Sequence, residues 1–436
     1  MANPTDTTGQ VLLPFREHVL DNGLRVILHE DPSAPIVAVH VMYHVGSKDE
    51  RPGRTGFAHL FEHLLFQGSE HVPRDGHFRY LQDAGGVLNG STWFDRTNYF
   101  ETVPANELDL ALWLESDRMG FFKPGITQEK LDNQREVVKN ERRQSYENRP
   151  YGLAWEALLE LAYPEAHPYR HPTIGYMEDL DRASLDDVRD FFDRYYPPNN
   201  ATLVLCGDID SAEALERVVR WFGEIPPRPV PPPPEVPAQA PGPGTRCVIE
   251  DRVQVPRAYL MFHAPSFGDP GFEAAATVTA LLAEGKSSRL HRELVYRRRI
   301  AADVSCFVWP LEKVGMMFVV ATARPGVSAA DLEAGIAETL SALLGEGVGE
   351  RELEGALNRA RRALVEGVNS VTNRADAFAH AAVLRDDPAY VSRAFERYAS
   401  LTRDEVNGLA RTLLGSDPNV LHVVPADDSA DPETAP

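Results

Sequence analysis

The chain has 436 residues, 43% of them hydrophobic and 25% charged, a composition typical of a soluble globular protein rather than a disordered or membrane one. This length predicts two or more domains. The formal net charge of −21 argues against nucleic acid and anionic membranes as partners, because both need a positively charged surface.

The N-terminus and the cysteines indicate the compartment. No apolar run reaches the ~20 residues that a membrane-spanning helix needs. Residues 1–10 have neither the basic nor the apolar region of a secretory signal, so we expect a cytoplasmic protein. The three cysteines have no paired spacing that would indicate a disulfide framework or a thiolate zinc site.

The first half of the chain alternates strand and helix signals. Residues 36–45 predict a strand with His40 and His44 on one face. These histidines would lie about 13 Å apart, too far to share a metal ion, so we interpret them as ordinary sheet residues. The elements predicted after this strand are a helix within 55–68, a glycine-rich stretch at 85–91, a strand at 98–103, and helices at about 106–119, 127–146 and 186–195.

A proline-rich segment interrupts the chain near its middle. Proline removes backbone donors and favours an extended conformation, so this segment predicts an interdomain linker. A ligand for a proline-binding module is the alternative. The predicted division is an N-terminal domain at 1–224, a linker at 225–245 and a C-terminal domain at 246–436.

The order of elements recurs after the linker. The second half predicts strands at 258–263 and 316–322 and helices at 272–283, 329–344 and 350–368. A repeat of this length indicates two duplicated domains. Aligning the first helix of each half places Ala276, Thr279 and Ala280 where the first half has His59, Glu62 and His63. We therefore expect a metal site in the first half of the chain and none at the matching place in the second half.

The metal-binding pattern is the sequence His-Leu-Phe-Glu-His at 59–63. Residues four apart share one face of a helix, so His59 and His63 can bind one metal ion with Glu62 beside them. A catalytic zinc site needs a third protein ligand and an open position for water. The predicted long helix at 127–146 and the residue after it offer three carboxylates for this role, namely Glu136, Glu141 and Glu147.

The His-x-x-Glu-His sequence resembles the inverted zinc motif of the pitrilysin/insulysin (M16) metallopeptidases. Gln134-Arg-Glu-Val-Val-Lys-Asn-Glu141 is similar to the segment that carries the third zinc ligand of that family. The resemblance implies Glu141 as third ligand, Zn²⁺ as cofactor and Glu62 as the catalytic base. Gln134 stands where relatives have an outer-shell glutamate, a departure that affects this outer-shell role and not zinc binding.

The resemblance covers most of the chain and includes the segments at 22–26, 85–92, 97–99, 167–169, 198–201 and 207–208. It implies an α+β fold of the type found in LuxS and mitochondrial processing peptidase. Two homologous domains would each have a mainly antiparallel sheet covered by helices. In the short subfamily, two such chains enclose a chamber.

The resemblance also implies how a peptide would be bound. Asn89, Gly90 and Ser91 would lie on an edge strand to which the substrate adds as a further strand. Active relatives carry an Arg and a Tyr near the scissile carbonyl, whereas Val295 and Ala302 stand in the matching positions here. The chain therefore resembles the zinc-bearing subunit of a heterodimer whose partner supplies the Arg/Tyr pair; a homodimer is the alternative.

The sequence is compatible with three classes of function. The first is a zinc endopeptidase acting on peptides or short unfolded segments, with processing of leader peptides as one such task. The second is a non-catalytic structural subunit, which would have no need of His59, Glu62, His63 and Glu141. The third is a zinc hydrolase of small molecules, which would consume small esters rather than peptides.

Overall fold

The computed structural model describes residues 12–236 and 244–426. Contacts within the chain divide it into two compact units. The first comprises Met1–Glu141, His171–Glu235 and Arg362–Glu396, and the second comprises Arg142–Arg170, Val236–Arg361 and Arg397–Pro436. Each unit therefore takes one segment from the other half of the sequence.

The first unit contains a six-stranded sheet. In spatial order its strands are β1 (Arg16–Val19), β2 (Arg25–Glu30), β6 (Ala201–Gly207), β3 (Ile36–Tyr43), β5 (Thr97–Pro104) and β4 (Val87–Thr92). All neighbouring strands are antiparallel except β2 and β6. β3 and β6 are buried almost throughout, as expected of central strands covered on both faces.

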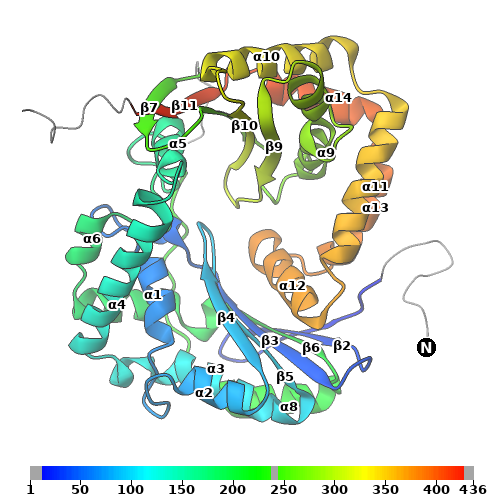
Figure 1. The fold of residues 1–436 in the computed structure, drawn as a ribbon. Coiled ribbons are helices and arrows are strands. Elements are labelled where there is room, and N and C mark those ends of the chain that lie inside the picture. The colour runs from blue at the N-terminus through cyan, green and yellow to red at the C-terminus, as the bar shows by residue number, and fades with distance from the viewer. Residues whose placement is uncertain (1–11, 237–243, 427–436) are drawn as a thin grey trace, which may run out of the picture. The chain divides into compact units, whose positions relative to one another are not determined.

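Helices cover both faces of this sheet (Figure 1). The helices of this unit are α1 (Phe57–Leu65), α2 (Gly76–Asp83), α3 (Leu108–Gly125), α4 (Gln128–Arg142), α6 (Met177–Asp181), α7 (Leu185–Tyr195), α8 (Ser211–Phe222) and α12 (Val371–Arg385). Helices α3 and α8 lie along one face, and α12 packs on β3 and β6 at the other. The apolar side of α12, with Ala375, Phe378 and Ala382, is buried against the sheet.

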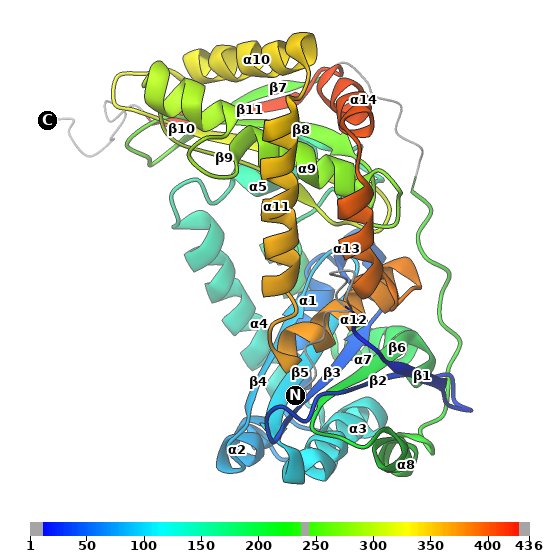
Figure 2. The same ribbon diagram turned by 90° about the vertical axis from the view of Figure 1, so that its right-hand side faces the viewer.

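The second unit contains a five-stranded sheet. Its order is β7 (Arg246–Asp251), β11 (Asn419–Pro425), β8 (Arg257–Ala264), β10 (Gly315–Ala323) and β9 (Ala301–Trp309), with only β7 and β11 parallel. Its helices include α9 (Phe272–Ala283), α10 (Ala329–Glu346) and α14 (Arg403–Leu414), which share one hydrophobic core with the sheet (Figure 2).

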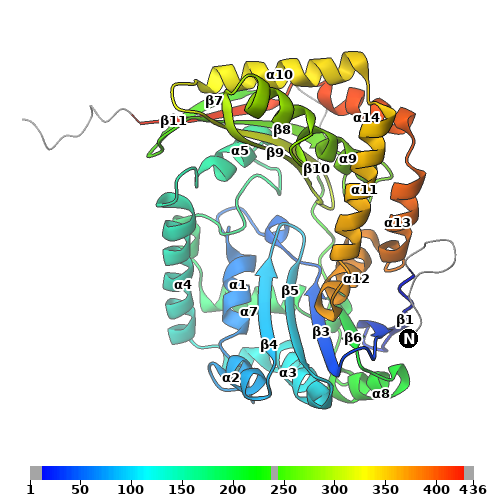
Figure 3. The same cartoon turned by 45° about the vertical axis from the view of Figure 1, so that its right-hand side comes forward.

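Helix α5 (Ala154–Ala162) belongs to the second unit although it lies in the first half of the sequence. Trp155 packs against Tyr259 and Phe318, at ring centroid distances of 5.7 and 5.2 Å. Helix α12 makes the reciprocal contribution to the first unit (Figure 3). Helices α11 (Glu350–Glu366) and α13 (Tyr390–Ser400) and the π-helical turns at Arg143–Glu147 and His291–Arg297 complete the main elements.

The structure confirms the expected fold class, two similar units each with a mainly antiparallel sheet and helices. The two compact units do not coincide with the predicted domains at 1–224 and 246–436. Helix α5, from the first half of the sequence, packs on the five-stranded sheet, and α12, from the second half, packs on the six-stranded sheet. Part of the predicted linker, 237–243, lies outside the described residues. In the part that is described, no helix is long and apolar enough to cross a membrane.

Candidate metal centre

Helix α1 positions the His-x-x-Glu-His residues. Its buried face, with Leu60, Phe61 and Leu64, packs into the core of the first unit. The 3.6-residue period then turns His59 and His63 together toward a less buried side. Their ring centroids lie 4.8 Å apart.

Helix α4 brings a carboxylate to these two imidazoles. Glu141 Oε2 lies 3.4 Å from His63 Nε2, and Glu141 Oε1 lies 3.8 Å from His59 Nε2. One ligand atom from each residue lies within 4.8 Å of the others, and no other such group of His, Cys, Asp or Glu occurs among the residues described. Glu136 instead pairs with Lys139 at 3.2 Å, and Glu147 faces Arg142 at 3.6 Å.

These separations suit a tetrahedral metal ion. Nitrogen and oxygen ligands about 2.0–2.2 Å from zinc are separated from one another by roughly 3.3 Å. One ligand atom from each of the three residues lies within 4.8 Å of the others, so modest side-chain movements bring the three to that spacing around one ion. Two imidazoles and one carboxylate also form a common catalytic ligand set for zinc, with a fourth position left open. The residues present therefore fit the ion.

The electrostatics of the site favour metal-binding protonation states. Burial, reinforced by the neighbouring His63, lowers the pKa of His59 to about 4, so its imidazole is neutral at physiological pH. The contact with His63 lowers the pKa of Glu141, which stays ionised. Neutral imidazole and ionised carboxylate are the forms that bind metal.

Glu62 differs from Glu141 in its surroundings. Burial raises its pKa, opposed by a hydrogen bond with Thr92 and by the positive charge of Arg96. A carboxylate with a raised pKa is a better proton acceptor than an ordinary surface glutamate. Glu62 thus lies beside the converging side chains, at the position where the motif predicts a proton-transfer group.

The N-terminus of α1 is held by a buried carboxylate that the sequence pattern did not reveal. Glu50 accepts hydrogen bonds from the backbone N–H groups of Gly56 and Ala58, at 2.9 and 2.7 Å. His171 Nε2 lies 2.8 Å from the same side chain. Two N–H groups that the helix leaves unpaired are satisfied in this way.

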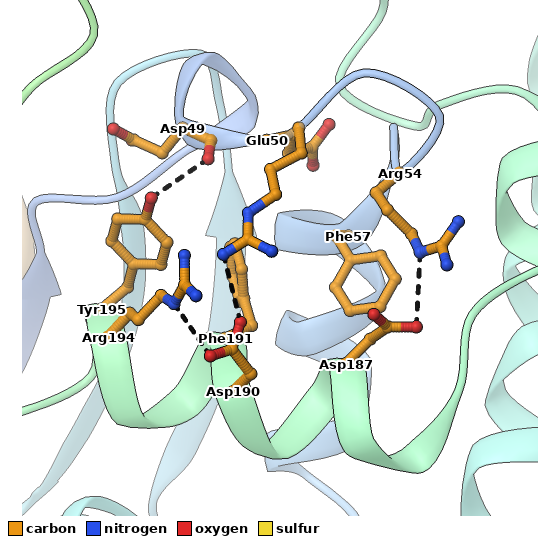
Figure 4. A pocket seen from close by; sticks show the side chains of 10 residues that line it. Asp49, Glu50, Arg54, Phe57, Asp187, Asp190, Phe191, Arg194 and Tyr195 are labelled. Atoms are coloured by element: carbon orange, nitrogen blue, oxygen red, sulfur yellow. Dashed lines mark hydrogen bonds and ion pairs between the residues drawn. The ribbon is translucent and has the colours of Figure 1, made fainter. Parts of the chain in front are cut away.

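Ion pairs with α7 hold the segment around Glu50 from outside (Figure 4). Arg51 pairs with Asp190 at 3.4 Å and Arg54 with Asp187 at 3.3 Å. These side chains line a small pocket of about 40 Å³ beside the start of α1. Its charges are already paired, so the pocket serves as support for α1 rather than as a ligand site.

The residues predicted to bind substrate lie on an edge strand. Asn89, Gly90 and Ser91 are on β4, at the edge of the six-stranded sheet. Their strand pairs with β5 on one side, and α1 packs against both strands. The backbone on the other side of β4 lacks a neighbouring strand among the residues described.

Three positions that depart from the pattern of the family lie on different elements. Gln134 is buried on α4 and donates to Asn133 Oδ1 at 3.0 Å. Val295 packs against the core of the second unit, and Ala302 is exposed on β9. Arg297 and Arg298, near Val295, form ion pairs with Glu293. The positions expected for an Arg/Tyr pair thus present apolar side chains.

A polar cluster formed by α12, β3 and the β4–β5 turn was missed by sequence reasoning. It contains Arg96, His40, Asp376 and His380. The strand pattern indicates no special role for His40, yet its Nε2 lies 2.9 Å from Asn98 Nδ2 and 3.3 Å from Asp376 Oδ1. No local spacing links residues 96 and 380, so only the folded chain could reveal the cluster.

The fold and the site define a two-domain protein with one inverted zinc-peptidase motif. The family model described as insulinase (peptidase family M16) matches residues 25–173, and the model described as peptidase M16 inactive domain matches residues 182–360. The chain belongs to the M16 family of peptidases. The inactive-domain description agrees with the absence of metal ligands at Ala276, Thr279 and Ala280.

Curated relatives support this assignment. The protein named zinc protease PqqE from Helicobacter pylori is 30% identical over 382 residues, covering 86% of this chain and 85% of the relative. The uncharacterized zinc protease YmxG from Bacillus subtilis is 23% identical, covering 92% of this chain and 96% of the relative.

Solved structures agree with the fold. A protease from Helicobacter pylori superposes with a TM-score of 0.90 at 26% identity, covering 95% of this chain and all of that one. A peptidase M16 inactive domain from Pseudomonas fluorescens has a TM-score of 0.86 at 17% identity, covering 95% of this chain and 98% of that one, and supports the fold alone.

Proposed function

We propose that this chain is a zinc-dependent endopeptidase, with His59, His63 and Glu141 as metal ligands and Glu62 as general base. The observation that carries this proposal is the convergence of the three ligand side chains from α1 and α4. A structural subunit would have no need of this arrangement. Several relatives named zinc proteases support the same activity.

The chemistry divides between the ion and the chain. Zinc, when bound, would supply a Lewis acid that makes water acidic enough to lose a proton near neutral pH. Glu62 would accept that proton at a carboxylate oxygen as the oxygen of water attacks the scissile peptide carbonyl. Glu62 would then donate the proton to the departing amine nitrogen, which completes the hydrolysis.

The edge strand β4 provides a surface for the substrate. A peptide in extended conformation would pair with the free side of β4 along Asn89, Gly90 and Ser91. Main-chain pairing selects for unfolded segments rather than for a particular sequence. Peptides and leader segments that precede a folded domain therefore fit this surface.

A partner chain would complete the catalytic site. Val295 and Ala302 offer no cation and no hydroxyl for polarising a carbonyl. We therefore propose that an M16-like companion supplies the Arg/Tyr pair within a chamber that the two chains enclose. A homodimer is the alternative assembly.

Substitution of Glu62 tests the peptidase activity. Glu62→Gln should retain zinc, measured by mass spectrometry of the metal, while kcat on a casein digest falls by about 100- to 10,000-fold. Glu129→Gln, at an exposed position near the start of α4, is the matched control and should leave kcat unchanged. Equal activity of wild type and Glu62→Gln would contradict the proposed role of Glu62.

Reconstitution tests the partner. Purified chain alone should cleave casein peptides slowly, and addition of a companion copurified from native extract should raise kcat at least about tenfold. Full activity of the chain alone, with no increase on adding the companion, would contradict the heterodimer. A zinc-loaded chain inert with every companion would instead favour the structural subunit, and consumption of small esters but not peptides would favour a small-molecule hydrolase.

A further inference from the structure

The cluster between α12 and the β4–β5 hairpin joins distant parts of the sequence. Arg96 lies in the turn that connects β4 to β5, and its Nε donates to His380 Nε2 on α12 at 3.3 Å. Helix α12 begins at Val371, beyond the last residue matched by either family model. The helix therefore reaches the proposed substrate strand through a contact that those models do not contain.

This hydrogen bond determines the protonation state of His380. An arginine Nε–H can only donate, so His380 Nε2 must present its lone pair. The imidazole is then neutral and carries its proton on Nδ1. That nitrogen lies 3.0 Å from the backbone oxygen of Asp376 and 3.3 Å from its Oδ1, both of which accept. The tautomer of His380 is thus set from both sides.

Asp376 extends the cluster to the centre of the sheet. Its Oδ1 lies 3.3 Å from Nε2 of the buried His40 on β3. His40 Nε2 is in turn 2.9 Å from Asn98 Nδ2 on β5. Asp376 on α12 therefore lies beside β3, in the same polar cluster as Arg96.

The other end of Arg96 holds the substrate strand. Its Nη1 donates to the backbone oxygen and the hydroxyl of Ser91, at 2.9 and 2.7 Å. The Ser91 hydroxyl in turn donates to Asn98 Oδ1 at 2.7 Å. Ser91 is the penultimate residue of β4 and pairs with Asn98 on β5. The guanidinium therefore fixes both the backbone and the side chain at this end of β4.

The charges that face Arg96 come from its own turn and from two other elements, α12 and α1. Burial lowers the pKa of Arg96, and the carboxylates of Asp376 on α12, Glu62 on α1 and Asp95 beside it oppose that shift. Arg96 remains a cation with carboxylates around it. Its hydrogen bonds to Ser91 are consequently charge-assisted, which makes them stronger than bonds between neutral groups.

We propose that Arg96 is a positioning residue for peptide binding, and that α12 holds it through His380 so that the Ser91 end of β4 is set before substrate arrives. The inference rests on the proposed peptidase function of β4. An edge strand that is already ordered binds an added strand without the entropy cost of ordering itself. Loss of the α12 contact should therefore weaken peptide binding more than it slows hydrolysis.

The test compares His380→Phe with a matched control in the full zinc-loaded chain. His380→Phe keeps a ring of similar size but removes the acceptor for Arg96. It should raise KM for an internally quenched casein peptide about tenfold and change kcat less than about twofold. His18→Phe, on β1 at the opposite edge of the same sheet, should leave both parameters unchanged.

A double-variant cycle tests whether α12 acts through Arg96. Arg96→Lys keeps the positive charge but loses the Nε donor, and it should raise KM to a similar extent. Adding His380→Phe to Arg96→Lys should then give no further increase, because the two side chains form one path. Independent, additive effects would overturn the inference, as would an unchanged KM in either single variant.

Two measurements without turnover separate this inference from the proposed function. Nitrogen-15 NMR of the imidazole should show His380 protonated on Nδ1, and hydrogen exchange of residues 87–92 should be faster in His380→Phe than in His18→Phe. If wild type cleaves no peptide, the proposed function fails while these readouts stand. Suppose that peptides are cleaved, but NMR shows His380 protonated on Nε2 or hydrogen exchange of residues 87–92 is the same in both variants. The positioning role of α12 then fails.

Discussion

Glu141 differs from the other carboxylates near it in what it faces. Its oxygens point to His59 and His63, whereas Glu136 pairs with Lys139. In Glu141→Ala, zinc would keep only two protein ligands. The variant should therefore lower zinc affinity by at least about 100-fold, more than the loss of a residue that only hydrogen-bonds to a ligand usually causes. Glu136→Ala should leave it unchanged. Competition with a fluorescent chelator measures both, and equal affinities would exclude Glu141 as a ligand.

His167 makes the stability of the second unit dependent on pH. Its ring is buried and stacks on Tyr163 at 4.0 Å, and its Nδ1 accepts from the Tyr169 N–H. Burial, with a smaller effect of His263, lowers its pKa to about 4 in the folded chain. As pH falls below about 6.5, His167 becomes protonated in the unfolded chain but stays neutral in the folded one. The free energy of unfolding therefore decreases until about pH 4, where the folded chain is protonated too.

Replacing His167 should reduce that loss. His167→Phe keeps an aromatic ring against Tyr163 but cannot be protonated. Between pH 7 and 4.5 the zinc-free variant should lose about 2 kcal/mol less unfolding free energy than wild type. Guanidinium unfolding at the two pH values measures the difference. The same pH dependence in both proteins would show that His167 does not titrate on unfolding in this range.

At the scale of elements, α1 depends on the carboxylate that caps it. Burial raises the pKa of Glu50, and the hydrogen bonds from Gly56, Ala58 and His171 oppose that shift. Glu50→Gln keeps the volume but loses the charge that these donors face. The variant should lose about 1–3 kcal/mol of unfolding free energy and bind zinc more weakly.

Thermal unfolding and chelator competition measure these two effects. Glu129→Gln makes the same chemical change at an exposed position and should alter neither quantity. If Glu50→Gln bound zinc as tightly as wild type, the cap would contribute to stability alone and not to the geometry of the metal site.

Elements with a clear hydrophobic periodicity could be predicted from the sequence. Features that depend on contacts between residues far apart in the sequence could not. The motif helix and the helix at Phe272–Ala283 have the expected type and place, because their patterns are local. Strands β2 and β6 form a parallel pair between residues far apart in sequence, which no local pattern reveals. The convergence of Glu141 with His59 and His63 was expected only from family resemblance, while Glu50 and Arg96 required the fold itself.

At the scale of the whole molecule, the sequence order does not coincide with the compact units. The first unit includes Arg362–Glu396, and α12 buries Phe378 and its neighbours on β3 and β6. A fragment of residues 1–224 would expose that apolar sheet face to water. We expect this fragment to aggregate or to lack cooperative unfolding, and coexpression with residues 246–436 to restore a soluble complex. A monomeric, cooperatively folded 1–224 fragment would contradict this expectation.

The contribution of α12 has a consequence for synthesis on the ribosome. The metal ligands and Glu62 all emerge early, but His380 and the rest of α12 follow more than two hundred residues later. At usual rates of translation this interval lasts roughly 10–50 seconds. During that time the nascent chain has its zinc-binding residues but neither a complete first unit nor an anchored Arg96. The order of synthesis would thus delay peptidase activity until α12 has been made.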